Sequence, residues 1–233
     1  NEVNPKRVGF DEITWVRHID DSEREEYESG DWVIPMGIVQ RDSDAQLQPA
    51  PRRDDYLPVT YKCPANYPGM EIGEDLSEDP RLRESFAIAL ASNRITASPA
   101  LPSGDDHPGV SIFLVCPILQ KRVDTANPDP TDALRGYIVG RLRLDRVLEN
   151  ALEPLTPAGI SIELSENTAT PDQRPTYYHP ARLVEHETDG RALQEILGRD
   201  AAALLDYHGV VQRDGRTWTL HFTANADYIA IRR

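Results

Sequence analysis

One carboxylate, Asp75, stands in the loop "YPGMEIGEDLSEDP" just ahead of the clearest helix start in the chain. An acid in this position caps the helix, remains a solvated loop residue, or serves as a catalytic base or polar anchor. Asp79 is better placed to cap, because Pro80 follows it at a position that suits the first turn of a helix. Asp75 is followed by the apolar Leu76, and a carboxylate above an apolar cavity accepts strong hydrogen bonds from ligand N–H groups. Asp75 is therefore a candidate anchor for a flat heterocycle with adjacent donors.

Catalytic motifs are not apparent elsewhere in the sequence. It has no GxSxG, HExxH or Walker motif, and "GIVQRD" and "GYIVGRL" lack the GxGxxG spacing. His107 in "GDDHPG" could bind a metal with Asp105 and Asp106, but Gly, Asp, His and Pro are ordinary turn residues, which favours a polar turn. The other histidines are scattered, and none is paired at metal spacing. A hydrolase using Asp75 and His107 is an alternative that lacks a complete set of nucleophile, base and orienting group.

Composition limits the class of protein and its partners. The 233 residues suit one large domain or two small ones, and 39% of them are hydrophobic. The formal net charge of -14, from 39 acidic and 25 basic side chains, argues against nucleic acid as a partner. No pattern predicts a cofactor. Cys63 and Cys116 are expected to be free, largely buried thiols, with a single bridge as the alternative in an oxidising compartment.

Periodicity predicts an α+β fold with two modules, 1–144 and 145–233, each a central antiparallel sheet flanked by helices. The best helix signal follows Asp79: Leu82, Phe86, Ala89 and Leu90 form an apolar stripe, and Asn93 can end the helix. A helix over 145–154 joins the modules. The other expected elements are strands at 13–19, 32–42, 56–63, 110–119, 134–144, 159–166, 175–179 and 227–233, a short helix at 20–30, a helical stretch over 190–209 with a break near Gly198, and a hairpin over 209–225 that turns at Asp214-Gly215.

Several of these segments, taken in order, resemble the CHASE domain. They are "ITWVRHIDDSEREEYE", "RDDYLPVTY", "GEDLSEDPRLRESFAIALASNRITASP", "HPGVSIFLVCPIL" and "LRGYIVGRLRL". The resemblance extends over roughly residues 10 to 150. It implies two PAS-like modules behind a long N-terminal helix, set between transmembrane helices, in the periplasmic or extracellular part of receptors such as histidine kinases, diguanylate cyclases and plant cytokinin receptors. It also implies a homodimer formed through that helix, and a small-molecule ligand in the membrane-distal module 1–144.

The resemblance also implies ligand-binding positions. Asp75 falls on an aspartate that accepts hydrogen bonds from the adenine ring in the cytokinin receptors, which indicates a planar, adenine-like ligand. Thr96 falls on an apolar pocket position, and Asp105 on a threonine near the ligand. Cys116 falls on an aromatic pocket position, and Gly140 on a glycine that leaves room for the ring. From the residues themselves, we add Tyr56 as a secondary polar contact to the ligand. We also add Gly136 as a second glycine, after Gly140, at which the backbone can come close to the ligand.

Only "NEVNPKRVGF" precedes the first expected strand, too little for the long helix of the family, and no membrane segment follows Arg233. We therefore expect an excised sensor region without catalytic activity of its own, whose parent receptor carries a kinase or cyclase output domain. A protein-interaction module without a ligand pocket is the third alternative.

Overall fold

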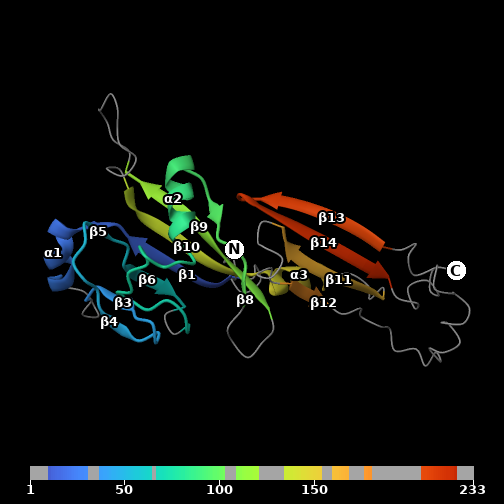
Figure 1. Ribbon diagram of the computed structural model, residues 1–233, viewed down its shortest axis with the longest axis horizontal. Coiled ribbons are helices and arrows are strands. Elements are labelled where there is room, and N and C mark those ends of the chain that lie inside the picture. Colours follow the sequence, from blue (N-terminus) through green and yellow to red (C-terminus); the bar gives the residue numbers. More distant parts are fainter. Residues whose placement is uncertain are drawn as a thin grey trace, which may run out of the picture. The chain divides into compact units, whose positions relative to one another are not determined.

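The chain forms two compact units in a computed structural model (Figure 1). The structure describes residues 10–30, 37–64, 67–102, 109–120, 134–153, 159–167, 176–179 and 206–224. Unit 1 comprises Asn1–Lys6, Phe10–Ser98 and Ile112–Leu142, and unit 2 comprises Arg7–Gly9, Pro99–Ser111 and Arg143–Arg233. The assignment of 1–144 and 145–233 as a membrane-distal and a membrane-proximal module stays a prediction.

Unit 1 is built on an antiparallel sheet in the order β6-β1-β10-β9-β7. The strands are β1 (Phe10–Arg17), β6 (Val59–Cys63), β7 (Thr96–Ala97), β9 (Val110–Leu119) and β10 (Leu134–Arg143). Side chains alternate along β1, so that Thr14 and Val16 are buried while Ile13 is exposed. In β9, by contrast, Ile112 and Phe113 are consecutive and both buried, which accounts for its long apolar run.

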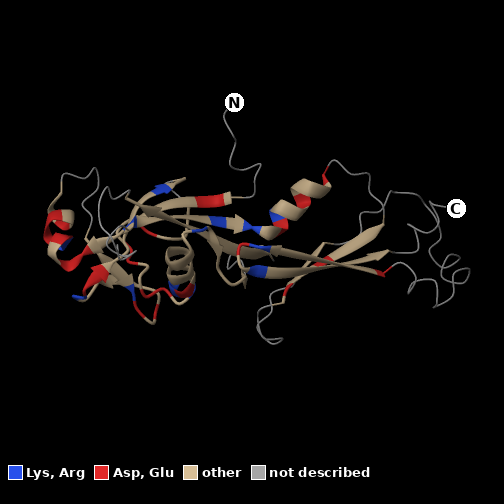
Figure 2. Cartoon of the chain, turned by 90° about the horizontal axis from the view of Figure 1, so that it is seen from above, with Lys and Arg blue, Asp and Glu red and all other residues tan. Residues whose placement is uncertain are grey.

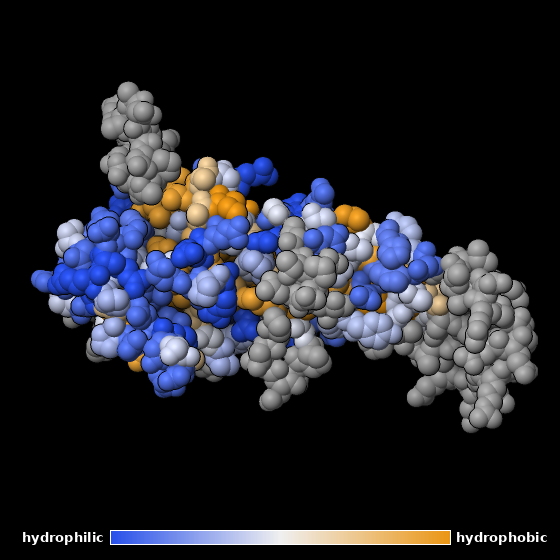
Figure 3. All heavy atoms as spheres, viewed as in Figure 1, coloured by the Kyte–Doolittle hydropathy of each residue, from blue (hydrophilic) through white to orange (hydrophobic). Residues whose placement is uncertain are grey.

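Helix α2 (Arg83–Ser92) packs on this sheet. The rings of Phe86 and Tyr137 lie 4.5 Å apart, and the Tyr137 hydroxyl donates to the Phe86 carbonyl. Burial raises the pKa of Tyr137 to about 12. Asp79 accepts the N–H of Arg81 ahead of the helix, and Asn93 ends it in the left-handed conformation (φ 49°). The predicted apolar stripe is therefore the packed face, whereas Ile88 of the same helix is exposed. Hydrophobic residues reach the surface over α2 (Figure 3).

A second layer of unit 1 is formed by short elements. They are β2 (Ile19–Asp20) paired with β5 (Asp55–Tyr56), β3 (Val39–Arg41) paired with β4 (Leu47–Pro49), and the helical segments η2 (Asp21–Glu23) and α1 (Arg24–Ser29). Their core contains Ile19, Tyr27, Ile38, Ala50 and Tyr56. The acidic residues of α1 are visible in Figure 2, and Arg52 pairs with one of them, Glu25.

Unit 2 contains a four-stranded antiparallel sheet in the order β12-β11-β14-β13. Its strands are β11 (Ile160–Glu166), β12 (Thr176–His179), β13 (Asp206–Arg213) and β14 (Arg216–Ala224), with helix α3 (Leu144–Leu152) before them. In the same unit, β8 (Leu101–Pro102) pairs with Val110 and Ser111 at the start of β9. The carboxylate of Glu166 is buried and accepts bonds from Arg216 and from the Ala100 N–H, which ties Ala100 to this sheet.

Three expectations need correction or lie beyond the described residues. Residues 206–209, expected at the end of a helix, begin strand β13, because the hairpin turning at Asp214-Gly215 extends further than the sequence suggested. The rest of the expected 190–209 helix and the 227–233 strand lie outside the described residues. Both cysteines are free, but Cys63 is exposed and Cys116 half-buried, since Cys63 ends the edge strand β6.

Gly136 gives the first testable prediction. Its φ is 144°, and an added Cβ would lie 2.1 Å from the backbone oxygen of Val16, so Gly136→Ala combines strain with a backbone clash. We expect a loss of about 2 kcal/mol or more in the free energy of unfolding, measured by urea denaturation. Gly37→Ala, whose added Cβ would meet nothing within 4 Å, is the control. Equal stability of both variants would contradict this packing.

Candidate ligand cavity

Unit 1 contains a cavity of about 560 Å³, a volume within the usual range for small-molecule sites. Most of its lining residues are polar or charged, and they come from β1, from β3 and the turn after it, from Arg53 ahead of β5, from the 69–81 segment, and from β9 and β10. The lining residues are Glu12, Gln40, Arg41, Asp42, Ala45, Arg53, Gly69, Met70, Glu74, Asp75, Glu78, Asp79, Pro80, Arg81, Phe113 and Arg141.

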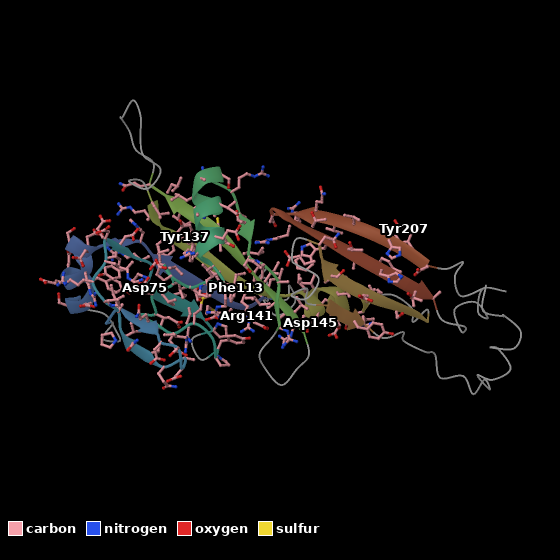
Figure 4. The ribbon with its side chains drawn as sticks, in the orientation of Figure 1. Asp75, Phe113, Tyr137, Arg141, Asp145 and Tyr207 are labelled. Atoms are coloured by element: carbon pink, nitrogen blue, oxygen red, sulfur yellow. The ribbon has the colours of Figure 1, made fainter. Side chains whose placement is uncertain are left out.

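The central sheet supplies one wall of the cavity. Glu12 on β1 pairs directly with Arg141 on β10, so both side chains stand on the same face of the sheet. Phe113 comes from β9, and the guanidinium of Arg81 lies 5.7 Å from the centre of its ring. Figure 4 labels Phe113, Arg141 and Asp75, which come from β9, from β10 and from the loop before α2. The wall thus combines an aromatic ring with charges of both signs.

Asp75 is held in place by the protein itself. Its Oδ1 accepts the N–H of Leu57 (2.8 Å) and of Ser77 (3.1 Å). Its Oδ2 accepts the Ser77 hydroxyl (3.1 Å) and lies 3.3 Å from Nη1 of Arg53. The side chain is fully buried, so Asp75 is not a solvated loop residue. The role of Asp75 as the ligand anchor stays a prediction, but both of its oxygens already have protein donors.

The segment around Asp75 explains this burial. The Asp75 N–H donates to the Val39 carbonyl (2.7 Å), and the Val59 N–H donates to the Glu74 carbonyl (2.9 Å). Residues 73–76 therefore run as an extended piece between β3 and the start of β6. Gly73 permits the close approach, since its φ is 85° and a Cβ would lie 2.4 Å from the Gly37 carbonyl oxygen.

Other acids of the cavity are paired as well. Glu74 accepts two bonds from Arg41, at 2.7 and 2.9 Å, in the bidentate geometry that suits a guanidinium. Asp79 accepts from Nε of Arg81 at 2.9 Å. These two pairs form part of the cavity wall, and the opposite charges within each pair offset each other.

Glu12 differs from these acids. The residue is 2% exposed, and its Oε1 has no hydrogen-bond partner among the residues that the structure describes. Burial raises the pKa of its carboxyl above the ordinary value, against the opposing influence of Lys62, of a hydrogen bond from the Met70 backbone N–H and of Arg141. The ammonium group of Lys62 is occupied by the carbonyls of Tyr67 and Met70. Glu12 therefore retains an unused acceptor beside the cavity.

Sequence reasoning missed Glu12 because the first strand was expected to begin at Ile13. The strand starts at Phe10, and the same alternation that buries Thr14 also buries Glu12. Extending the period-2 pattern by a few residues would have found it.

The remaining predicted site residues are not part of the cavity lining. Tyr56 is fully buried, and its hydroxyl contacts Arg24 (3.0 Å) and the Arg53 N–H (2.8 Å). Thr96 is buried on β7, and Cys116 is half-buried on β9. The added Cβ of Gly140 would lie 2.7 Å from the Phe10 ring, and that of Gly136 would meet β1, so both glycines accommodate the chain's own packing. Asp105 and the alternative catalytic residue His107 lie outside the described residues.

Metal-ligating side chains also occur in unit 2. Within the described residues, donors with suitable spacing gather at Asp206, His208 and His221 on the β13–β14 hairpin.

The model of the CHASE domain matches residues 1–177, which is more than half of the 233 residues. The chain belongs to the CHASE domain family. This CHASE domain is therefore a sensor domain of the extracytoplasmic, ligand-binding type. No curated protein matches it in sequence. Within the described residues, no helix is both long and apolar enough to cross a lipid bilayer.

Solved structures similar to this CHASE domain share little sequence with it. An extracellular ligand-binding receptor from Desulfohalobium retbaense is 14% identical (TM-score 0.41), and the match covers 72% of this chain and 28% of that one. The ligand-binding domain of the Pseudomonas aeruginosa PAO1 amino acid chemoreceptor PctC, in complex with GABA, is 13% identical (TM-score 0.41; 96% and 77% covered). A methyl-accepting chemotaxis protein X is 12% identical (TM-score 0.34; 93% and 75% covered).

The hydrogen bonds of Asp75 predict a structural cost for removing it. Asp75→Ala leaves the Leu57 N–H and the Ser77 N–H without their acceptor and removes the ion-pair partner of Arg53, so we expect a loss of about 3 kcal/mol in unfolding free energy. Thermal melts of both variants measure this loss. Glu78→Ala, which removes an exposed acid of the same lining, should change the free energy of unfolding by less than about 0.5 kcal/mol. If Asp75→Ala melts like the control, Asp75 does not hold this loop.

Proposed function

We propose that the chain is the extracytoplasmic sensor domain of a transmembrane receptor and that it binds a small ligand in the cavity of unit 1. The observation that carries the proposal is the buried Glu12 carboxylate at a cavity large enough for a small molecule, because its Oε1 has no partner among the described residues. A buried carboxylate oxygen without a donor is costly, so a ligand donor placed there gains a strong hydrogen bond.

The ligand class follows from the lining. Glu12 accepts from N–H groups, and Phe113 and Met70 offer aromatic and thioether surface that suits a flat ring. We infer a small planar nitrogen heterocycle, of adenine type, with N–H groups directed at Glu12. The resemblance to cytokinin-binding family members supports the same class. Asp75 contributes by fixing the position of the wall rather than by supplying an empty acceptor.

The parent receptor forms the rest of the proposal. In it, flanking transmembrane helices place this domain outside the cytoplasm, a long N-terminal helix mediates homodimerisation, and ligand binding biases a kinase or diguanylate cyclase output domain. The domain itself carries no catalytic activity in this scheme. The support for these points is the family membership of residues 1–177.

Ligand binding is tested first by native mass spectrometry of the purified domain, and then by calorimetric titration with adenine-type and other planar nitrogen heterocycles. Glu12→Gln should weaken binding about 10- to 100-fold, because a charged acceptor is replaced by a neutral one. Glu78→Gln, an exposed acid of the lining, is the matched control and should bind like the wild type. Equal affinity of all three proteins for a ligand found in this way would refute Glu12 as the anchor.

Glu12 also predicts a pH dependence of stability in the ligand-free domain. Its pKa is raised above 4.5 on folding, so its contribution favours the folded state at pH below the unfolded pKa. That contribution is lost as the pH rises through the folded pKa, where the buried group must ionise. Glu12→Gln stays neutral, and it should therefore be more stable than the wild type at pH 8, by about 1 kcal/mol, with the difference closing toward pH 4. Thermal melts across this range measure it, and a Gln variant that is less stable at pH 8 would show that the carboxylate is paired.

A further inference from the structure

The hairpin of β13 and β14 brings two histidines together that are far apart in the sequence. The turn at Asp214-Gly215 sets the register, in which His208 pairs with His221 and Asp206 pairs with Thr223. Because side chains two residues apart share a face of a strand, these four side chains stand together. On the opposite face, the ring of Tyr207, which Figure 4 labels, packs against the ring of Phe222, and the ring centres lie 5.9 Å apart.

The two imidazoles converge on one carboxylate. The rings of His208 and His221 are stacked, with centres 4.2 Å apart and planes inclined by 14°. Nε2 of His221 contacts Oδ1 of Asp206, and Nε2 of His208 lies 3.7 Å from Oδ2 of the same residue. The potential ligand atoms of the three residues all lie within 4.8 Å of one another.

The three side chains form a common ligand set for transition metals. They offer two imidazole nitrogens and a carboxylate oxygen, and the potential ligand atoms are close enough to share one ion. Because an imidazole nitrogen binds a metal in the plane of its ring, a divalent cation would satisfy all three donors once the two rings turn out of their stacked arrangement.

We propose that Asp206, His208 and His221 bind one divalent transition-metal ion with the coordination preference of Zn²⁺. Two imidazole nitrogens and one carboxylate oxygen supply three positions of a tetrahedron, and water takes the fourth. Imidazole ligands select Zn²⁺, Cu²⁺, Ni²⁺ or Co²⁺ over Mg²⁺ and Ca²⁺, which prefer oxygen ligands alone. The side chains of His208 and Asp206 are 60% and 39% exposed, so the ion enters directly from solvent.

This site has a structural consequence within unit 2. Asp206 and His208 lie on β13, and His221 lies on β14, so a bound ion links the two strands. Because metal that binds only the folded state stabilises it by mass action, Zn²⁺ should raise the melting temperature of the domain. The site is composed of residues that the ligand cavity does not use, and metal binding is therefore independent of the proposed sensor function.

The test uses untagged protein treated with a chelator and then titrated with Zn²⁺ by calorimetry. We expect one ion per chain at this site and a higher melting temperature with Zn²⁺ than with Mg²⁺. His208→Gln, His221→Gln and Asp206→Asn should each weaken binding by more than about tenfold, since losing even an outer-shell partner costs about 10- to 100-fold. His18→Gln removes a histidine that lies 3.5 Å from Asp55, with no third ligand nearby among the described residues, and this variant should bind Zn²⁺ like the wild type.

Replacing Zn²⁺ with Co²⁺ gives a second readout, because four-coordinate cobalt absorbs visible light strongly. The absorption should be present in the wild type and in His18→Gln and absent from the three ligand variants. Melting curves recorded without metal establish that each variant is folded. The proposal is overturned if the wild type takes up no Zn²⁺, or if binding survives unchanged in all three ligand variants.

Discussion

The burial of carboxylates constrains the cavity-bearing unit of this acidic chain more than any other interaction. Asp75 is fully enclosed, and it receives donors from Leu57, from Ser77 and from Arg53. These bonds fix the 73–76 segment between β3 and β6, and with it one side of the cavity. Glu74 in the same segment is held by Arg41. Without these partners the two acids would oppose the burial of the loop before α2, because a buried charge is tolerated only with partners.

Asp75 and Glu12 differ in how far the protein itself satisfies their carboxylates. Both are buried and both border the cavity, but the oxygens of Asp75 are occupied, whereas Oε1 of Glu12 has no partner in the part of the chain that the structure describes. A fully satisfied carboxylate stabilises the fold and has little left to offer a ligand. A buried carboxylate with too few donors destabilises the ligand-free domain and favours the binding of any molecule that supplies a donor. A binding site can therefore lower the stability of the fold that contains it.

Patterns of local origin were predictable from the sequence, and contacts between distant segments were not. The apolar run 110–119 is strand β9, and the stripe after Asp79 is helix α2, since each pattern repeats with the period of its own element. The sequence position of Asp75, in the loop before a helix, was enough to predict that it borders the cavity. Its partners could not be predicted, because Leu57 and Arg53 come close to it only when the chain folds. Gly136 and Gly140 were expected to make room for a ligand, yet they make room for β1 and for Phe10.

The hairpin histidines show where a sequence argument could have gone further. The Asp214-Gly215 turn was recognised, and a two-residue turn fixes which residues face each other along both strands. Counting outward from it pairs Arg213 with Arg216 and, five pairs further on, His208 with His221. The histidines were judged unpaired because the spacing was examined along the chain rather than across the turn. In an antiparallel hairpin, metal-ligand spacing is a property of the register, so a predicted turn is enough to search for it.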